Sequence, residues 1–410
     1  MKPKILLIYI DSGGGHRAAA TALCEVIRQQ GRPWDVEMVS IQDLLDPIDF
    51  IRKYTGIRFQ DVYNIMLRRG WTAGTAQLIP LMHLVIRLSH GKQVSVLQRY
   101  WSQHRPDMVV SLIPHYNRAL RTTLDQVWPG TPFVTLLTDI ADYPPHFWIE
   151  RVNQHVICGS EMAVRQALEI GIPKEHVLLT SGMILNPRFY VPLNLNRRVE
   201  RMRRGLRPDL LTGLVMFGGE GSSEMLRIAK ALNREDCGIQ LILLCGKNEE
   251  LAGQLRGMKQ NIPMFVQGFT RDVPLYMEIS DFFIGKPGPG SISEALAKQL
   301  PVIVQRNAWT LAHERYNVDW VEKMGVGLAV RDFATGLPGA VKTMRDPATF
   351  ERFRARAAEM RNSAVYEIPH LLERILSNYR PDGRTPRSEG PLSLPAMPRE
   401  FRPGEFPLSN

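Results

Sequence analysis

The stretch Ile5-Leu-Leu-Ile-Tyr-Ile-Asp-Ser-Gly-Gly-Gly-His16 sets the pattern for the whole chain. Its six apolar or aromatic residues form one continuous run that ends at Asp11, which is typical of a strand buried on both faces of a parallel sheet. Three consecutive glycines follow, and residues 17–30 then carry strong helix formers. This order predicts a buried strand, a tight turn and a helix, which together open an α/β domain.

Similar apolar runs recur along the chain, with helical segments between most of them. After the first run they lie at 36–41, 108–113, 132–137 and 155–158, and, beyond a stretch without apolar runs, at 213–217, 240–245, 264–266, 281–284 and 301–304. A strand followed by glycines and a helix occurs once in each series. We therefore predict an α/β fold of two tandem, Rossmann-like, doubly wound domains of similar size.

The composition along the chain suggests where these domains begin and end. We expect a first domain over residues 1–190, a linker over 191–208 and a second domain over 209–380. The helical stretch 365–379 would close the second domain. The tail 381–410 holds 7 of the 29 prolines and no periodic pattern, so we expect it to be disordered.

The overall composition limits the classes of function. The chain has 410 residues, with 51 Lys and Arg against 41 Asp and Glu, and this net charge of +10 favours an anionic partner. Its four cysteines lie far apart, which argues against a disulfide framework and a zinc site. No run of about 18 apolar residues is present, and the first apolar run is too short for a signal peptide. We expect a cytoplasmic protein.

Most of the positive charge is concentrated in residues 51–105. This segment has nine Lys or Arg residues and one acidic residue, Asp61. Apolar side chains accompany the charge, a combination that suits a helix lying on an anionic membrane. Ordinary core packing with a solvated basic face is the alternative. A nucleic-acid surface is disfavoured because no recognition motif accompanies the charge. The apolar residues are Trp71, Ile79, Leu81, Met82, Leu84, Val85, Ile86 and Leu88.

The first glycine loop carries a candidate base. Gly13, Gly14 and Gly15 are consecutive and are followed by His16, so the loop fits neither the dinucleotide fingerprint nor a Walker A loop. Glycines allow a ligand to approach the backbone closely, and a histidine at a helix start suits a general base near neutral pH. The alternative is a surface or capping histidine.

Two glycine loops in the second half are candidate phosphate sites. Residues 217–223 repeat the strand–glycine–helix order, although a tight turn without a ligand would have the same sequence. The stretch Gly285-Lys-Pro-Gly-Pro-Gly-Ser-Ile-Ser-Glu294 is more specific: a phosphate would dock at the start of the helix that it opens. Glu294 would then bind ribose hydroxyls. Alternatively, Ser291 and Glu294 form a capping box, and Lys286 is a solvated surface residue.

These loops resemble those of GT-B glycosyltransferases, and in particular the monogalactosyldiacylglycerol synthase and processive diacylglycerol glucosyltransferase group. That group is related to the transferase that adds N-acetylglucosamine to lipid I. The match departs from the group's pattern at 182–185 and at Ala312-His-Glu-Arg-Tyr-Asn317, where the group usually has Gly-Gln before the Glu. The matching segments, spread from about residue 4 to about 330, are 11–17, 62–67, 105–107, 138–139, 182–189, 217–219, 268–269 and 286–294.

The resemblance implies a GT-B fold, in which two Rossmann-like domains face a central cleft, and an inverting transfer from a UDP-sugar to a lipid hydroxyl. It implies that the first domain binds the acceptor and the membrane, while the second binds the donor. Glu294 would hold the ribose, Phe269 would lie near the uracil, and Glu314 and Asn317 would contact the sugar. The diphosphate would be bound by Gly218, Gly219, Gly288, Gly290 and Ser291.

Inversion needs one base for the acceptor proton and positive charge or dipoles near the leaving diphosphate. His16 is the best candidate for the base; Asp139, which follows Thr138 at the end of a strand, would orient His16 or act as the base itself. A strand-end turn is the alternative role for Asp139. Helix dipoles and Lys286 would offset the leaving charge. Because the chain has no Asp-x-Asp triplet, we expect no metal and no other cofactor.

The favoured function is hexosyl transfer to 1,2-diacylglycerol at the inner face of a membrane. One alternative is a GT-B enzyme with another acceptor, such as lipid I, or a UDP-sugar epimerase. A non-catalytic module that binds UDP-sugar or anionic lipid is the other. The sequence identifies neither the donor sugar nor the oligomeric state.

Overall fold

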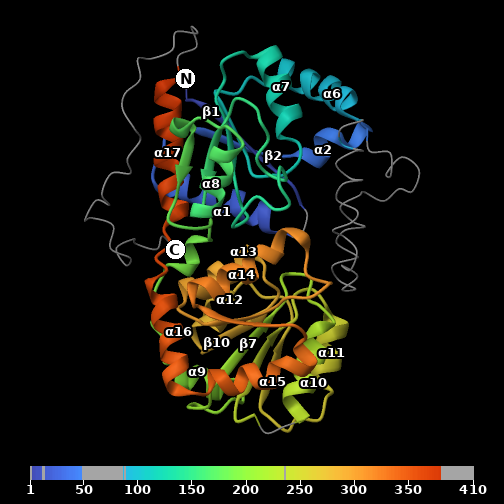
Figure 1. The fold of residues 1–410 in the computed structure, drawn as a ribbon, viewed down its shortest axis with the longest axis vertical. Coiled ribbons are helices and arrows are strands. Elements are labelled where there is room, and N and C mark those ends of the chain that lie inside the picture. The colour runs from blue at the N-terminus through green and yellow to red at the C-terminus, as the bar shows by residue number, and fades with distance from the viewer. Residues whose placement is uncertain (1, 12–13, 49–85, 87–88, 235–236, 380–410) are drawn as a thin grey trace.

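The computed structural model describes residues 2–11, 14–48, 86, 89–234 and 237–379. In this part of the chain the strands form two six-stranded sheets, and every neighbouring pair of strands is parallel. The two sheets lie in separate halves of the molecule, one above the other in Figure 1. The predicted pair of doubly wound α/β domains is confirmed.

The first sheet has the strand order β2-β1-β3-β4-β5-β6. Strand order reverses between β1 and β3, so the loops that follow these two strands border a crevice at the carboxyl edge of the sheet. The predicted runs correspond to strands within a residue or two, whereas the short β6 was not predicted. The strands are β1 (Lys4–Tyr9), β2 (Asp35–Ser40), β3 (Met108–Ser111), β4 (Phe133–Leu136), β5 (His155–Cys158) and β6 (Val177–Leu179).

The second sheet has the order β12-β11-β10-β7-β8-β9, with its reversal between β7 and β10. The two glycine-rich loops predicted to bind phosphate follow these two strands. The sequence therefore places both loops at the reversal point, where ligands bind in such sheets. The strands are β7 (Thr212–Met216), β8 (Gln240–Leu244), β9 (Met264–Gln267), β10 (Phe282–Gly285), β11 (Val302–Gln305) and β12 (Gly327–Val330).

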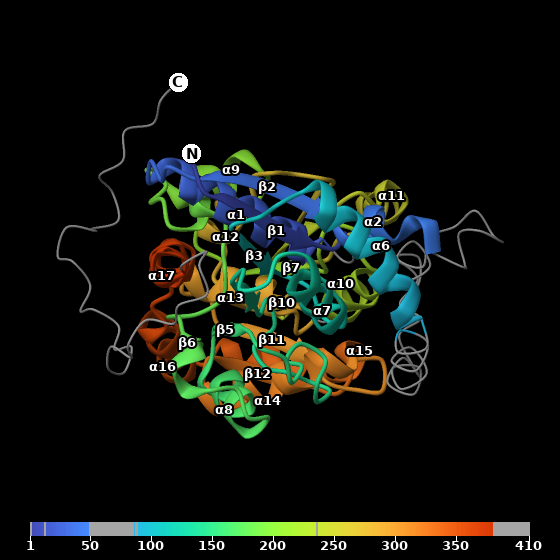
Figure 2. The same ribbon diagram turned by 90° about the horizontal axis from the view of Figure 1, so that it is seen from above.

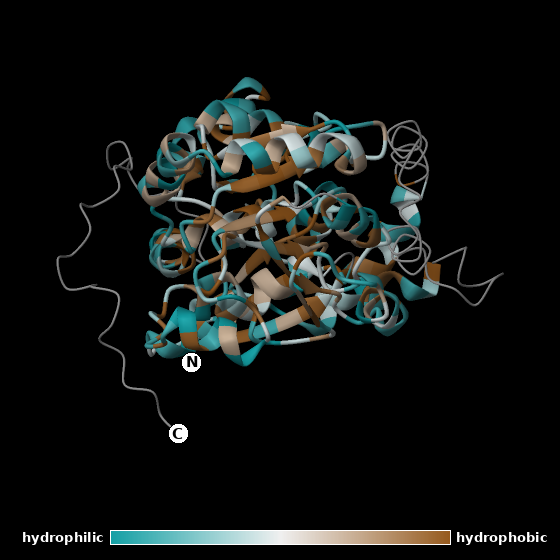
Figure 3. Cartoon of the chain, turned by 90° about the horizontal axis from the view of Figure 1, so that it is seen from below, coloured by the Kyte–Doolittle hydropathy of each residue, from teal (hydrophilic) through white to brown (hydrophobic). Residues whose placement is uncertain are grey.

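Helices cover both faces of each sheet, so most of the strands are largely apolar, as Figure 3 shows. In the first half, Ile5 and Leu7 pack towards α1 (Gly15–Gln29), whereas Leu6 and Ile8 pack towards the opposite face. That opposite face is covered by α6 (His90–Gln103) and α7 (Asn117–Val127). The remaining helices of this half are α2 (Ile41–Leu45) and α8 (Glu161–Glu169).

The second half has the same layered arrangement, and Figure 2 shows its helices around the strands. Helices α10 (Glu224–Arg234), α11 (Glu249–Arg256) and α15 (Phe333–Met344) cover one face of the sheet. Helices α12 (Val273–Glu278), α13 (Pro289–Ala297) and α14 (Arg315–Met324) cover the other. The chain then continues into α16 (Pro347–Glu359).

The last helix, α17 (Ala364–Asn378), packs on the first half, although the sequence assigned it to the second. Ile368, Leu372 and Ile375 join the core that Ile5 and Leu7 form, and α17 lies beside α1 in Figure 1. The sequence predicted the helix, but its position in the chain does not determine which surface it covers.

The chain therefore crosses between the halves twice, and the two crossings touch. Asn362 Nδ2 donates to the Met183 carbonyl at 2.9 Å, and the Ser363 backbone N–H donates to Ser181 Oγ at 2.8 Å. A Cβ on Gly182 would lie 2.8 Å from Asn362 Cγ, so the two segments are in close contact.

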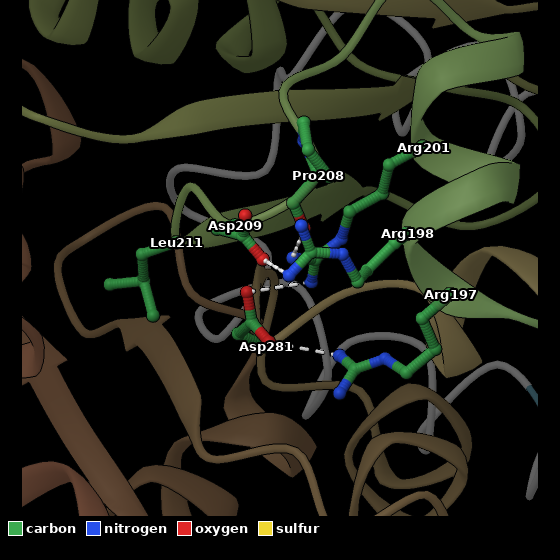
Figure 4. Close-up of a pocket in the computed structure, with 7 residues that line it drawn as sticks. All are labelled: Arg197, Arg198, Arg201, Pro208, Asp209, Leu211 and Asp281. Atoms are coloured by element: carbon green, nitrogen blue, oxygen red, sulfur yellow. Dashed lines mark hydrogen bonds and ion pairs between the residues drawn. The ribbon is translucent and has the colours of Figure 1, made fainter.

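The predicted linker contains a helix, α9 (Arg197–Arg203), which is anchored to the second sheet. Arg197 Nη2 and Arg201 Nη2 each bind one oxygen of Asp281, at 2.9 and 2.8 Å (Figure 4). Asp281 directly precedes β10, so these contacts and the pocket they border lie at the amino edge of the sheet, opposite the glycine loops.

Candidate active site

His16 lies at the carboxyl edge of the first sheet, as the second residue of α1. The turn before it needs Gly14, whose φ of 80° is in the left-handed region that favours glycine. Gly15 begins the helix, and Gly13 lies outside the described residues. His16 Nδ1 is 2.9 Å from Thr138 Oγ1, and the Trp148 ring lies 5.5 Å from the imidazole. The glycine turn and the Thr138 contact therefore fix the position of His16 beside the end of β4.

Burial makes His16 a neutral imidazole. It lowers the pKa of His16 to about 4; a positive charge on His313 acts in the same direction, and a backbone hydrogen bond with Leu112 opposes them. A neutral imidazole can accept a proton, as a general base must. An anionic diphosphate in the cleft would raise this pKa towards neutrality, because it would favour the charged form.

Asp139 is more deeply buried than His16, but it does not orient His16 as the sequence suggested. Trp148 Nε1 donates to Asp139 Oδ2 at 2.7 Å, while the hydrogen-bond partner of His16 is Thr138. Burial raises the pKa of Asp139, whereas nearby positive charge on His313 lowers it. Asp139 thus remains a second candidate for the base, and the Trp148 N–H fixes the position of its carboxyl group.

Lys286 and Glu314 form the ionic centre of the second half. Glu314, in the short helix η4 (Ala312–Glu314), is buried, and its Oε1 is 2.9 Å from Lys286 Nζ. Lys286 is thus paired, and its side chain is only partly exposed. A Cβ on Gly288 would lie 3.5 Å from the same Glu314 oxygen, so the glycine loop runs directly past this ion pair.

Asn317 holds the same loop from α14. Its Nδ2 donates to the Pro287 carbonyl at 2.8 Å, which fixes the loop's path. Its Oδ1 is buried and has no hydrogen-bond partner among the described residues. A buried acceptor without a donor is unfavourable, so this oxygen is available to a ligand hydroxyl.

The helix after this loop starts earlier than a capping box would require. Helix α13 begins at Pro289 with Gly288 as N-cap, so Gly290 and Ser291 lie in its first turn, where backbone N–H groups have no helical acceptor. The capping-box alternative for Ser291 and Glu294 is therefore wrong. Burial raises the pKa of Glu294 to about 8, and no hydrogen bond or ion pair with another described residue offsets it.

The other predicted donor residues lie at the same edge of the second sheet. Gly218 has a φ of 78°, and Gly219 packs closely against Gly246, where a Cβ would be 2.2 Å from the Gly219 carbonyl oxygen. Phe269, just after β9, leaves 53% of its surface exposed, as a ring available for stacking would. An ion pair joins Lys286 and Glu314, and Asn317 is hydrogen-bonded to Pro287 of the same loop. The remaining donor residues share only the edge of the sheet.

Contacts across the cleft bring the two halves of the site together. The Phe147 ring stacks on His313 with centroids 5.5 Å apart, and Tyr143 lies 5.3 Å from Tyr316. The charges of Lys286 and Glu314 both reach Asp139. Sequence reasoning selected none of Phe147, Trp148 and His313, because their roles depend on contacts between distant segments.

Comparison with known proteins identifies the class of enzyme. Residues 214–371 match the glycosyltransferase family 28 C-terminal domain. The protein is a glycosyltransferase. Over 351 residues it is 28% identical to a probable chloroplastic monogalactosyldiacylglycerol synthase 2 of Oryza sativa subsp. japonica, covering 80% of this chain and 71% of the relative. The corresponding enzyme of Arabidopsis thaliana is 27% identical over 354 residues, covering 80% and 70%.

Solved structures confirm the GT-B fold of this glycosyltransferase. MurG of Acinetobacter baumannii superposes with a TM-score of 0.60 at 14% identity, covering 91% of this chain and 99% of MurG. The complex of S. aureus MnaA with UDP superposes with a TM-score of 0.59 at 17% identity, covering 95% and 100%. These likenesses extend over both domains.

Two further features of the described residues concern the membrane and metal ions. None of their helices combines the length and apolar content that crossing a membrane requires. They also hold no group of three or more His, Cys, Asp or Glu side chains placed to bind a metal ion. Most of the basic segment 51–105 lies outside the described residues, so its membrane role stays a prediction, as does the disordered tail.

Proposed function

We propose that this glycosyltransferase moves a hexose from a UDP-sugar to a membrane lipid, most simply the free hydroxyl of 1,2-diacylglycerol, with inversion at the anomeric carbon. The observation that supports the proposal is that His16 is fixed by Thr138 in the first half, and that the Lys286–Glu314 pair of the second half lies near Asp139, the residue after Thr138. The names of the plant relatives support a diacylglycerol acceptor.

In this proposal the second half binds the donor. The N–H groups at the start of α13 and the charge of Lys286 stabilise the diphosphate as it leaves. Glu294, the unpartnered carboxyl beyond them, binds the ribose hydroxyls. Glu314 and Asn317 orient the hexose, and Phe269 stacks on the uracil. In this proposal the negative charge of the leaving diphosphate is offset without a metal ion or another cofactor.

The first half binds the acceptor and supplies the base. His16 takes the hydroxyl proton as the oxygen attacks the anomeric carbon, and the bond to the diphosphate breaks. The glycine turn before His16 leaves room for the lipid headgroup. The basic segment 51–105 attaches the enzyme to the anionic inner face of a membrane from the cytoplasmic side.

A liposome assay tests the proposal. Purified protein is incubated with diacylglycerol in liposomes with or without anionic phospholipid, and separately with UDP-galactose, UDP-glucose and UDP-N-acetylglucosamine. Mass spectrometry of the lipids should show one hexosyl-diacylglycerol, with more product on anionic liposomes. Release of free UDP without a glycolipid, or conversion of the donor to an epimer, would contradict the proposal.

Two matched variants decide which residue is the base. If His16 is the base, His16→Ala abolishes transfer and Asp139→Asn retains a substantial fraction of it, since an asparagine oxygen can still accept the Trp148 N–H. The reverse result would assign the base to Asp139. UDP affinity, measured by calorimetry, should stay unchanged in both variants, because neither residue belongs to the donor half.

A further inference from the structure

A short loop after β8 joins the glycine loop of residues 217–223 to the end of β9. The Lys247 backbone N–H donates to the Gly219 carbonyl at 2.8 Å, and the Cys245 N–H donates to the Gln267 carbonyl at 2.8 Å. Gly246, between them, has a φ of 59° and packs so closely on Gly219 that no Cβ would fit. The backbone of Lys247 is therefore fixed beside the glycine loop.

The side chain of Lys247 is paired with a carboxylate of that loop. Lys247 Nζ lies 3.2 Å from Glu220 Oε1, and Glu220 stands between the glycines of the loop. A second carboxylate, Glu224, follows the loop in α10 and is paired with Arg227 at 2.8 Å. The glycine loop thus brings negative charge of its own to this edge of the sheet, and each of these two carboxylates has a cation beside it.

The pair of Lys247 and Glu220 contributes little to the stability of the fold, but it matters for an anionic ligand. The Lys247 side chain is 62% exposed, and ion pairs at exposed side chains stabilise proteins only slightly. The Glu220 side chain is 23% exposed, so water screens its charge less completely. A carboxylate within a loop of N–H donors repels the anion that those donors would bind. The neighbouring ammonium offsets this repulsion.

We propose that Lys247 determines how strongly the donor half binds a diphosphate, because its ammonium offsets the negative charge that Glu220 brings to the glycine loop. This inference rests on the proposed function, in which the second half binds a UDP-sugar. Lys247 acts through the charge of Glu220, so it is a positioning residue and not a catalytic one. The uncharged nucleoside part of the donor does not depend on the pair.

Calorimetric titrations of the full-length protein with UDP and with uridine test the inference. Lys247→Met should weaken UDP binding about tenfold, as expected for one partly screened unit charge near the ligand, and leave uridine binding unchanged. Glu220→Gln should strengthen UDP binding. The double variant has no net charge at this pair, so it should bind UDP about as well as the wild type does. Lys247→Arg keeps the charge and should change neither affinity.

Lys259→Met is the matched control, because Lys259 is an exposed lysine of the same half that precedes β9 and so lies at the opposite edge of the sheet. It makes the same change of charge and should leave UDP binding unchanged. A salt titration adds a second readout, since the difference between Lys247→Met and the wild type should shrink as the salt concentration rises.

Two results would overturn the inference. One is an unchanged affinity of Lys247→Met for UDP, and the other is an equal loss of affinity for UDP and uridine, which would mean that the substitution disturbs the site as a whole. Because UDP binding needs no acceptor, either result counts whether or not the liposome assay yields a glycolipid. Wild-type protein that does not bind UDP would contradict the proposed function itself, and this inference with it.

Discussion

The two halves of the cleft differ in how completely their polar groups are satisfied. On the acceptor side, His16 is paired with Thr138, Asp139 with Trp148, and aromatic rings fill the space around them. On the donor side, the half-buried Glu294 carboxyl and the buried Asn317 Oδ1 have no partner among the described residues. Around His16 the polar groups are paired without a ligand, whereas the second half has unpartnered groups that a nucleotide sugar would complete if the proposed function is correct.

The largest expected effect concerns the acceptor side. His16→Ala should lower transfer by about 10²–10⁴-fold, the usual contribution of a general base, without changing UDP affinity. The difference between the two halves predicts that the rate falls while the affinity stays the same, because His16 already has its hydrogen-bond partner without the nucleotide. Initial rates and calorimetric binding measure the two quantities. A weakened affinity for UDP would show that His16 also contributes to nucleotide binding.

Thr138→Val is the matched control for that variant. It keeps the shape of the side chain and removes the hydroxyl that holds His16 Nδ1. We expect an intermediate loss of transfer, because the imidazole remains but its orientation is less fixed. A loss as large as that of His16→Ala would show that the imidazole acts only in the orientation that Thr138 imposes.

The second prediction concerns the ion pair of the donor side. Lys286→Met should lower the free energy of unfolding by about 3 kcal/mol, because it leaves the buried Glu314 carboxylate without its counter-charge. Glu314→Gln should cost less, since Lys286 can still reach water. Thermal or urea unfolding of both variants and of the double variant measures the coupling. Equal losses in the two single variants would contradict this asymmetry.

The third prediction concerns Glu294. Glu294→Gln should weaken UDP binding about tenfold, which corresponds to the loss of a hydrogen bond to a charged group. Without a ligand, however, it should stabilise the protein. Burial raises the pKa of Glu294 from 4.5 to about 8 in the folded protein, so the folded state holds a proton that the unfolded chain releases.

That difference makes stability fall as the pH rises from about 4.5 to 8. The gain in melting temperature of Glu294→Gln over the wild type should therefore be larger at pH 8 than at pH 5. Saturating UDP should reduce this gain, because the nucleotide supplies the missing partner. A gain that is the same at both pH values would mean that Glu294 is already paired.

The smallest expected effect is a gain in the stability of the donor half that leaves its affinity for UDP unchanged. Gly253 lies inside α11, and a Cβ there would meet no atom within 4 Å. Gly253→Ala should raise the free energy of unfolding by about 0.5–1 kcal/mol and leave UDP affinity unchanged. A change in affinity would mean that the stability of this half as a whole, and not the unpartnered groups alone, controls nucleotide binding.

Most strands could be predicted from the sequence, because strands buried in parallel sheets are continuous apolar runs. The strands β6 and β12 were not predicted: β6 has only three residues, and β12 begins with a glycine. The glycine loops could be placed because each directly follows such a run. Only the capping-box alternative placed the start of α13 too late, although Pro289 at its first position was an available signal.

The acceptor-side neighbours of His16 could not be found in the same way. Thr138 and Asp139 are adjacent in sequence, and only the folded chain shows which of them meets the imidazole. His313 lies 297 residues beyond His16 in a polar segment without periodicity. Neither composition nor spacing predicts a stacking contact between two separate domains.

The two adjoining crossings, near Met183 and near Asn362, determine how the cleft can open. A single flexible connection would let the halves slide, twist and separate in any direction. Two connections that are bound to each other act as a hinge. The expected motion is therefore a rotation of one half about this hinge, which opens the cleft on the side away from the crossings. A protease cut at either crossing alone would leave the halves joined through the other, so only a double cut would release them.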